Sequence, residues 1–569
     1  MYLKSRVKVP DIHGKITHLR RGDITYIKYE YDRYYDPEKK YTYPQRATIG
    51  KLCADDENMM IPNETFLKYF PDAVLSGMED RTDRSSCLRI GTYAVINKII
   101  KDYKLDEMLS QFFNERDLAL LLDLASYSIV EESNVAQHYP DYAYNHPLCS
   151  SGMKIYSDAT ISEFFKGITK DKSTGFLNEW NQKRNKRERI YISYDSTNKN
   201  CQAGDIELAE FGHAKTDIGS PIINYSVGYD LKNKEPLFYE AYPGSINDVS
   251  QLRTMLGKIT GYGYKKIGFI LDRGYFSRGN IRYLDECGYS FVIMAKGMSS
   301  FISELILENK GTFENKRVCD MNAYGVYGKT VQRTLFEGDE RKRYIHIYHS
   351  VTKEADERNA FENALRERTS LLMSHQNETV EFGSAYKRYF YLHYDENGVF
   401  LYPEEKTTVT EREIALCGYF VIITSERMTA KEALHLYKSR DVSEKLFAYD
   451  KSFLGGKSMR SHTNEGVEGR IFTQFIALII RNKIYTSLQE LAEQLEKKQN
   501  YMTVPAAIKE LEKIEMTRQT DNVYRLDHAV TAKQKKILKA FDMTDGSITY
   551  RAGEISNTLR NANLVQRKE

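Results

Sequence analysis

Five short apolar runs between residues 190 and 295 limit this chain to few possible sheet topologies. Each run is rich in β-branched or aromatic residues and ends in polar turn residues, which is typical of a buried strand. Helical periodicity over Asp248–Ile259 and Ser277–Cys287 separates the last three runs. Three successive strands followed by alternating helices and strands indicate an α/β fold, with a mixed sheet covered by helices. The strands are expected at Ile190–Asp195, Ile222–Tyr229, Pro236–Tyr242, Lys266–Leu271 and Tyr289–Ala295, with another at Tyr419–Ile423.

Two aspartates stand at the ends of these runs. Asp195 closes the first run, and Asp272 directly follows the fourth. Functional groups of open α/β sheets gather at the carboxyl ends of the strands, so we expect the two carboxylates to lie close together. The alternative interpretation is that Asp195 is a turn residue and Asp272 a helix cap.

A predicted helix over Thr429–Lys451 carries a third acidic residue among cations. Tyr437, Arg440, Glu444 and Lys451 stand at relative positions 0, 3, 7 and 14. At about 100° per residue, these positions fall within roughly a 60° wedge of one helix face. Thr429 with Glu432 predicts a capping box, and Gly455 predicts the stop. A phenol, two cations and a carboxylate beside the core are costly to desolvate, which indicates a site. The alternative is an exposed helix with ordinary charge pairs.

Three carboxylates at one point would form a metal site. Asp195, Asp272 and Glu444 would repel one another unless cations neutralised them. Oxygen-only ligation suits Mg²⁺ or Mn²⁺. The sequence therefore predicts a divalent-metal centre made by these residues.

These residues resemble the DDE transposases of bacterial insertion sequences, in the insertion-sequence-four-like superfamily with the pattern Y-x2-R-x3-E-x6-K. Tyr437, Arg440, Glu444 and Lys451 match this pattern without a gap. Asp195, in DST, and Asp272, in DRGYF, match the first and second catalytic aspartates. The resemblance covers roughly Tyr191 to Tyr485, about half of the chain. The N-terminal segment YDRYYDPEKKYTYPQRATIGKL is similar more weakly.

The resemblance implies a ribonuclease H-like core interrupted by a β-rich insertion that contacts DNA. The segment between Gly297 and Cys417 is too long for a simple loop, which agrees with an insertion. Predicted domains are an N-terminal β-rich arm (1–86), a helical DNA-binding domain (87–187), a core in two parts (188–297 and 417–486), the β-rich insertion (298–416) and a C-terminal helical domain for dimerisation or DNA contact (487–569).

The resemblance also implies an activity: metal-dependent cleavage at the terminal inverted repeats of an insertion sequence, and strand transfer into target DNA. Asp195, Asp272 and Glu444 would be the catalytic, metal-binding triad, holding two Mg²⁺ ions for which Mn²⁺ would substitute. The expected partners are transposon-end DNA, target DNA and a second protomer in a homodimeric synaptic complex. The residues expected to contact DNA are Tyr437, Arg440, Lys451, Lys438 and Arg273. Some relatives cut the second strand through a DNA hairpin with the help of tryptophans; the only tryptophan here, Trp180, precedes the catalytic strands, which disfavours that route.

Two other functions remain open at this point. One is a catalytically silent transposase-derived protein that binds DNA without cutting it. The other is a metal-dependent nuclease of repair or DNA junctions that uses the same fold. Inverted repeats flanking the coding sequence would favour the transposase, and cleavage of many DNA ends without preference would favour the general nuclease.

Composition limits the class and the compartment. With 41% hydrophobic and 28% charged residues, the chain is expected to be globular and not disordered. The net charge of +3 does not by itself indicate nucleic-acid binding, but basic residues cluster between Lys183 and Arg189 and around the glutamate helix. Seven scattered cysteines without C-x-x-C pairs argue against a zinc site and for a reducing compartment. The expected location is the bacterial cytoplasm, at the nucleoid.

Overall fold

The computed structural model divides the chain into two compact units, residues 1–85 and 86–569, which we describe separately. The described residues are 2–3, 5–22, 24–53, 56–71, 73, 84–183, 189–203, 205–212, 219–246, 248–264, 266–295, 299–495, 500–521 and 523–565. Within these ranges, the side chains of residues 248–249, 299, 443–444, 448–449, 453, 501 and 561–565 lie outside the description.

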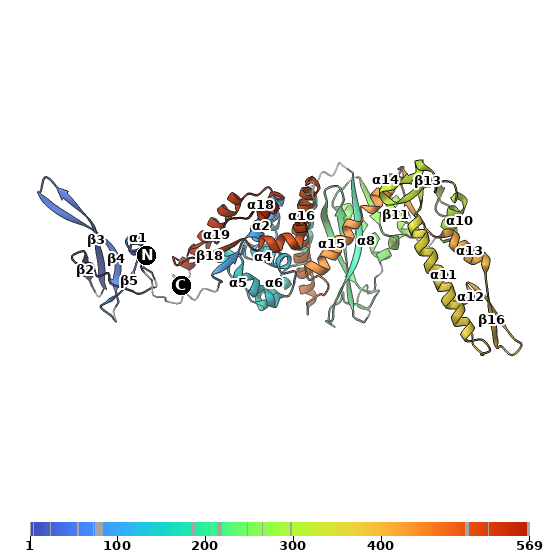
Figure 1. Cartoon of the computed structure of the whole chain (residues 1–569), viewed down its shortest axis with the longest axis horizontal. Helices are drawn as coiled ribbons and strands as arrows, with labels where there is room; N and C mark the ends of the chain where they lie inside the picture. Colours follow the sequence, from blue (N-terminus) through green and yellow to red (C-terminus); the bar gives the residue numbers. More distant parts are fainter. Residues whose placement is uncertain are drawn as a thin grey trace. The chain divides into compact units, whose positions relative to one another are not determined.

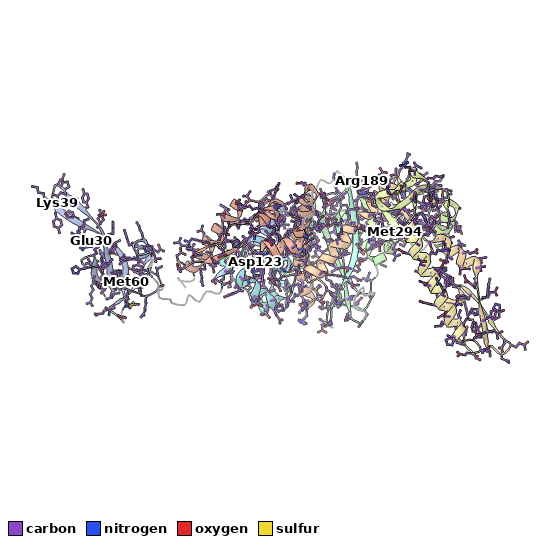
Figure 2. All side chains as sticks on the ribbon, in the orientation of Figure 1. Glu30, Lys39, Met60, Asp123, Arg189 and Met294 are labelled. Carbon is purple, nitrogen blue, oxygen red and sulfur yellow. The ribbon has the colours of Figure 1, made fainter. Side chains whose placement is uncertain are left out.

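The first unit is an antiparallel sheet with one short helix, α1 (Glu64–Tyr69) (Figure 1). The turn at residues 37–40 joins its two longest strands. Its small core includes Met60, and the buried Glu30 accepts hydrogen bonds from Arg33 and Arg46 (Figure 2). Its strands, in the order β1-β5-β4-β3-β2, are β1 (Val7–Lys8), β2 (Ile16–Arg21), β3 (Ile24–Asp36), β4 (Tyr41–Leu52) and β5 (Met59–Pro62).

The second unit is built on a mixed sheet, which confirms the predicted fold class at this level. Among the described residues this sheet has nine strands, in the order β12-β13-β14-β17-β11-β10-β7-β8-β9. Strands β7, β10 and β11 are parallel, and the pairs on either side of them are antiparallel. The central strands are β7 (Ile190–Asn200), β8 (Ile222–Asp230), β9 (Glu235–Pro243), β10 (Ile267–Leu271), β11 (Ser290–Met294) and β17 (Tyr419–Thr424).

All six predicted core strands and both intervening helices, α8 (Asp248–Gly261) and α9 (Arg278–Glu286), are therefore present. One boundary is wrong. The strand predicted to end at Asp195 continues to Asn200, because β8 pairs with it from Ile192 to Asn200. Asp195 thus lies inside a strand, and it is neither a strand end nor a turn residue.

The expected β-rich insertion is only partly β. Three of its strands, β12 (Asp320–Met321), β13 (Val326–Thr334) and β14 (Lys342–His349), extend the central sheet because β14 pairs with β17. Most of the rest is helical, and it packs a small core of its own around the hairpin of β15 (Phe390–Tyr394) and β16 (Phe400–Glu405). Its helices are α10 (Ser299–Asn309), α11 (Val351–Ser374), α12 (Ser384–Lys387) and α13 (Thr407–Leu416).

Helices before and after the sheet pack together. The central helix is α16 (Asn464–Gln494); its residues Ile471, Phe472, Phe475, Ile476, Ile479 and Ile480 are fully buried. It contacts α4, α6 and β9. The N-terminal helices are α2 (Gly91–Tyr103), α3 (Leu105–Leu109), α4 (Glu115–Val130), α5 (Tyr139–Asn145), α6 (Asp158–Lys166) and α7 (Lys170–Gln182). Trp180 of α7 is buried and donates to the carbonyl of Pro236 at 2.8 Å, so it serves packing.

The C-terminal segment joins this helical region through a small sheet. Strand β18 (Glu515–Arg518) pairs with both β19 (Tyr524–Leu526) and β6 (Cys87–Arg89). The remaining helices are α17 (Val504–Leu511), α18 (Ala532–Lys539) and α19 (Asp545–Val565). Across the described parts of the chain, no helix is long and apolar enough to span a bilayer.

Candidate active site

Strand register brings the two predicted aspartates side by side. In the parallel pair β7–β10, Tyr194 lies opposite Leu271, so the next residues, Asp195 and Asp272, are neighbours across the sheet. Adjacent strands lie about 4.8 Å apart, which is close enough for both carboxylates to reach one ion. Asp272 precedes the 3₁₀ turn Arg273–Tyr275, but its side chain makes no capping hydrogen bond there. The cap interpretation of Asp272 is therefore wrong.

Arg440 lies between the two carboxylates. Its Nη1 is 3.6 Å from Asp195 Oδ2 and 3.7 Å from Asp272 Oδ1. The Tyr437 hydroxyl donates to Asp272 Oδ1 at 3.5 Å, and the guanidinium of Arg440 lies 5.5 Å from the centre of the Tyr437 ring. The side chain of Asp272 is 37% exposed and that of Asp195 only 14%, so a ligand would approach from the side of Asp272. One cation thus already offsets part of the negative charge of the pair.

Tyr437 and Arg440 do not belong to one continuous helix. The predicted helix over Thr429–Lys451 is two helices, α14 (Ala430–Lys438) and α15 (Asp441–Phe453), so the single 60° wedge is wrong. The Ser439 hydroxyl donates to the carbonyl of Leu436, a local bond that competes with the helical ladder. The amide of Arg440 bonds the carbonyl of Tyr437 in a 3₁₀ pattern, which places Arg440 at the junction.

Both predicted ends of the two-helix segment are confirmed. Thr429 and Glu432 form the full capping box at the start of α14. Helix α15 ends at Phe453, and Gly455 follows with a φ of 66°.

The other predicted site residues are arranged more loosely around this pair. The backbone of Glu444 lies in α15, which packs on β7, but its side chain is outside the described residues. Arg273, next to Asp272, and Lys438, next to Tyr437, are exposed. Lys451 is half-buried in the last turn of α15. The structure therefore brings Asp195, Asp272, Tyr437 and Arg440 together and leaves Glu444 as a prediction.

The donor set fits a hard divalent cation. Oxygen atoms of Asp195 and Asp272 converge on a single positive group, Arg440 Nη1, which shows that the site accommodates a cation. Carboxylate oxygens are the ligands that Mg²⁺ and Mn²⁺ prefer. Among the side chains that the structure describes, no group of three His, Cys, Asp or Glu could hold a metal, and the third carboxylate predicted from Glu444 lies outside those side chains.

Comparison with known proteins identifies the family. A family model described as a transposase DDE domain matches residues 193–480, just over half of the 569 residues. The chain belongs to this DDE transposase family. No curated protein matches it. The predicted resemblance to DDE transposases is thereby confirmed, whereas the insertion-sequence-four-like group and the bacterial origin stay predictions.

Two solved transposase structures are similar only at a low level. One is a cryo-EM structure of a piggyBac transposase synaptic complex with hairpin DNA, at 10% identity and a TM-score of 0.35, covering 74% of this chain and 76% of that chain. The other is the Drosophila P element transposase strand transfer complex, at 9% identity and a TM-score of 0.19, covering 72% and 97%. Likenesses this weak carry no argument about this DDE domain.

A buried ion pair of the DDE domain was missed by the sequence analysis. Lys199 of β7 and Asp450 of α15 form an ion pair with side chains only 1% and 0% exposed. Lys199 Nζ also donates to the carbonyl of Gly456 at 3.0 Å and lies 4.6 Å from the centre of the Tyr225 ring. A Cβ on Gly456 would come within 2.4 Å of Asp450 Oδ2, so this approach requires glycine. The pair joins the strand of Asp195 to the helix of Glu444.

Proposed function

We propose that this protein is a transposase that cuts DNA at the terminal inverted repeats of its own mobile element and joins the freed ends to target DNA. The observation that carries the proposal is the convergence of Asp195, Asp272, Tyr437 and Arg440, within a matching DDE domain. In this proposal the element is a bacterial insertion sequence, and two protomers pair its two ends.

Asp195 and Asp272, together with Glu444, would hold two divalent ions. Bound there, the ions would activate water and stabilise the leaving oxygen of an in-line displacement. Water attacks the phosphorus at the element boundary, the P–O3′ bond breaks, and the 3′ oxygen leaves as a hydroxyl. In the second step that 3′-hydroxyl attacks the phosphorus of a target phosphodiester, the P–O3′ bond of the target breaks, and the target 3′ oxygen leaves as a hydroxyl, so no phosphoryl–protein bond is needed.

The neighbouring side chains position the DNA. With a metal held by the two carboxylates, the guanidinium of Arg440 would be free to bind a phosphate through two parallel N–H groups. Tyr437 keeps the carboxylate of Asp272 oriented through its hydroxyl. In this proposal Arg273, Lys438 and Lys451 contact the phosphates on either side of the cleaved bond.

The test is cleavage of a labelled duplex that carries the element's own terminal repeat, with Mg²⁺ and separately with Mn²⁺. We expect cuts at the repeat boundary in both metals, and none on a duplex with a scrambled repeat. Specific binding without cutting in either metal would instead identify a silent DNA-binding protein. Cutting that ignores the repeat would identify a general nuclease.

Replacing Arg440 should separate its two roles. In Arg440→Gln the repulsion between Asp195 and Asp272 is no longer neutralised, so Mg²⁺ should raise the melting temperature more in the variant than in the wild type. Cleavage should fall by roughly 10²- to 10³-fold, because a charged hydrogen-bond donor to the DNA phosphate is lost. Arg440→Lys, which keeps the charge, should restore the metal response but only part of the cleavage. An unchanged metal response in Arg440→Gln would contradict the arrangement.

A further inference from the structure

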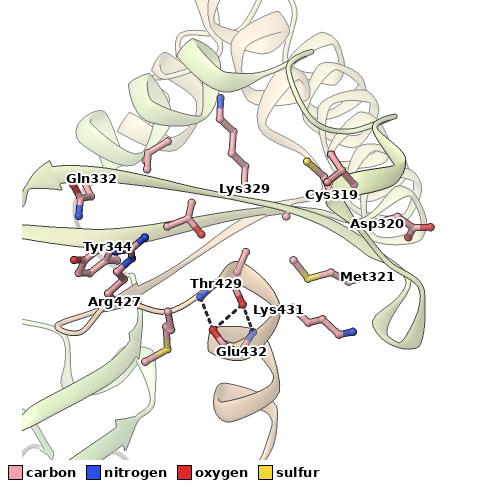
Figure 3. A pocket seen from close by; sticks show the side chains of 16 residues that line it. Cys319, Asp320, Met321, Lys329, Gln332, Tyr344, Arg427, Thr429, Lys431 and Glu432 are labelled. Atoms are coloured by element: carbon pink, nitrogen blue, oxygen red, sulfur yellow. Dashed lines mark hydrogen bonds between the residues drawn. The ribbon is translucent and has the colours of Figure 1, made fainter.

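Two concave regions lie beside each other on the half of the sheet that carries β11, β17, β14 and β13. The first, of about 1050 Å³, lies between β13 and the N-terminal end of α14 (Figure 3). The second, of about 520 Å³, lies at the edge where β10, β11 and β14 begin and β17 ends. Tyr344 of β14 lines both regions, so we treat them as one track.

The residues that line this track are strongly cationic. They include eight Lys or Arg and four Asp or Glu, an excess of four positive charges, whereas the whole chain has a net charge of only +3. Three of the four carboxylates already have partners: Glu426 pairs with Arg189, Asp285 with Arg343, and Glu432 with the α14 cap. The uncompensated charge is therefore positive.

Four cations supply most of this excess. Lys266, Lys342, Arg427 and Lys431 are exposed, and within the described part of the chain none of them has an ion pair. Lys431 and Arg427 belong to the first region, and Lys266 and Lys342 to the second. Exposed cations spaced along a groove suit a repeating polyanion better than a small anion, which would need convergent donors in one pocket.

The track leads away from the catalytic carboxylates. Helix α14 begins at the first region and ends next to Tyr437, whose hydroxyl contacts Asp272. Nine helical residues span about 13 Å, which corresponds to about four base-pair steps of duplex DNA. A duplex whose cleaved bond lies at Asp272 can therefore reach the track within half a helical turn.

We propose that this track binds the sugar–phosphate backbone of duplex DNA that extends beyond the catalytic centre. The proposal rests on the proposed function for the identity of the polyanion. The resemblance implies that the β-rich insertion (298–416) contacts DNA. The track assigns this contact to the β12–β14 part of the insertion and to neighbouring residues outside it. Residues 351–416 of the insertion carry 13 Asp or Glu against 8 Lys or Arg, so phosphate would be repelled there and attracted by the track.

The experiment measures binding alone. A variant with Lys266, Lys342, Arg427 and Lys431 all changed to Gln is titrated with a labelled random-sequence duplex at several salt concentrations between about 50 and 200 mM. The slope of log K against log salt is negative, and each lost phosphate contact reduces its magnitude by about 1, so the slope should become shallower by about 4. Because no cleavage is measured, the result holds whether or not the carboxylates cut DNA.

A matched variant controls for total charge. Lys170, Arg282, Arg412 and Lys509 are exposed cations outside the track, without an ion pair among the described residues. Changing these four to Gln should leave the salt slope within about 1 of the wild type. Equal losses in the two variants would overturn the track. So would an unchanged DNA slope together with altered sedimentation of the DNA-free protein, which would identify a protein partner at the track.

Discussion

Asp195→Asn, Asp272→Asn and Glu444→Gln should each reduce cleavage at the element boundary by roughly 10³-fold or more. Each change removes one charged ligand while keeping the size of the side chain. Groups that act as a unit are not additive, so the double variant Asp195→Asn/Asp272→Asn should be no slower than the worse single variant. The measurement is the single-turnover cleavage rate of a labelled repeat duplex at saturating protein.

The matched control is Asp441→Asn, an exposed acid in the first turn of α15, three residues before Glu444. It should cleave within about twofold of the wild type, because the exposed Asp441 side chain has no hydrogen bond or ion pair with the described site residues, and such surface substitutions have small effects. All five variants should bind the repeat duplex, since none removes a cation. Full activity of Glu444→Gln would exclude it as the third ligand, and full activity of either aspartate variant would refute the proposed site.

The positions of the central strands could be predicted from the sequence, because each core strand is a short, continuous apolar run between polar turns. The order of strands followed from the alternation of helices and strands. Proximity of Asp195 and Asp272 was also predictable, although for a partly wrong reason. Asp195 is not at the end of β7; it lies level with the end of the neighbouring strand β10, and only pairing with β8 reveals the difference.

Other features depend on contacts that no local pattern contains. The break at Ser439–Arg440 comes from one hydroxyl bonding a carbonyl, in a segment whose periodicity continues across it. Strands β12 to β14 were assigned to a separate insertion because alternation shows a strand but not its partner. The pair of Lys199 and Asp450 joins residues 251 positions apart, so the separate residues show only an ordinary lysine and aspartate.

Breaking the pair of Lys199 and Asp450 should cause the largest loss of stability in the DDE domain. Both side chains are almost fully buried, so Lys199→Met leaves a carboxylate, and Asp450→Leu an ammonium, without its partner in a dry environment. Removing one partner of a buried pair costs about 3–5 kcal/mol. The melting temperature should therefore fall by roughly 5 °C in either single variant.

The double variant Lys199→Met/Asp450→Leu decides whether the effect comes from the pair. Two apolar side chains leave no buried charge, so most of the lost melting temperature should return, and a double-mutant cycle should give a coupling of at least about 2 kcal/mol. Lys98→Met is the control, since its ion pair with Asp102 is exposed and should contribute less than about 1 kcal/mol. Additive losses in the double variant would show that packing, and not the ion pair, holds α15 against β7.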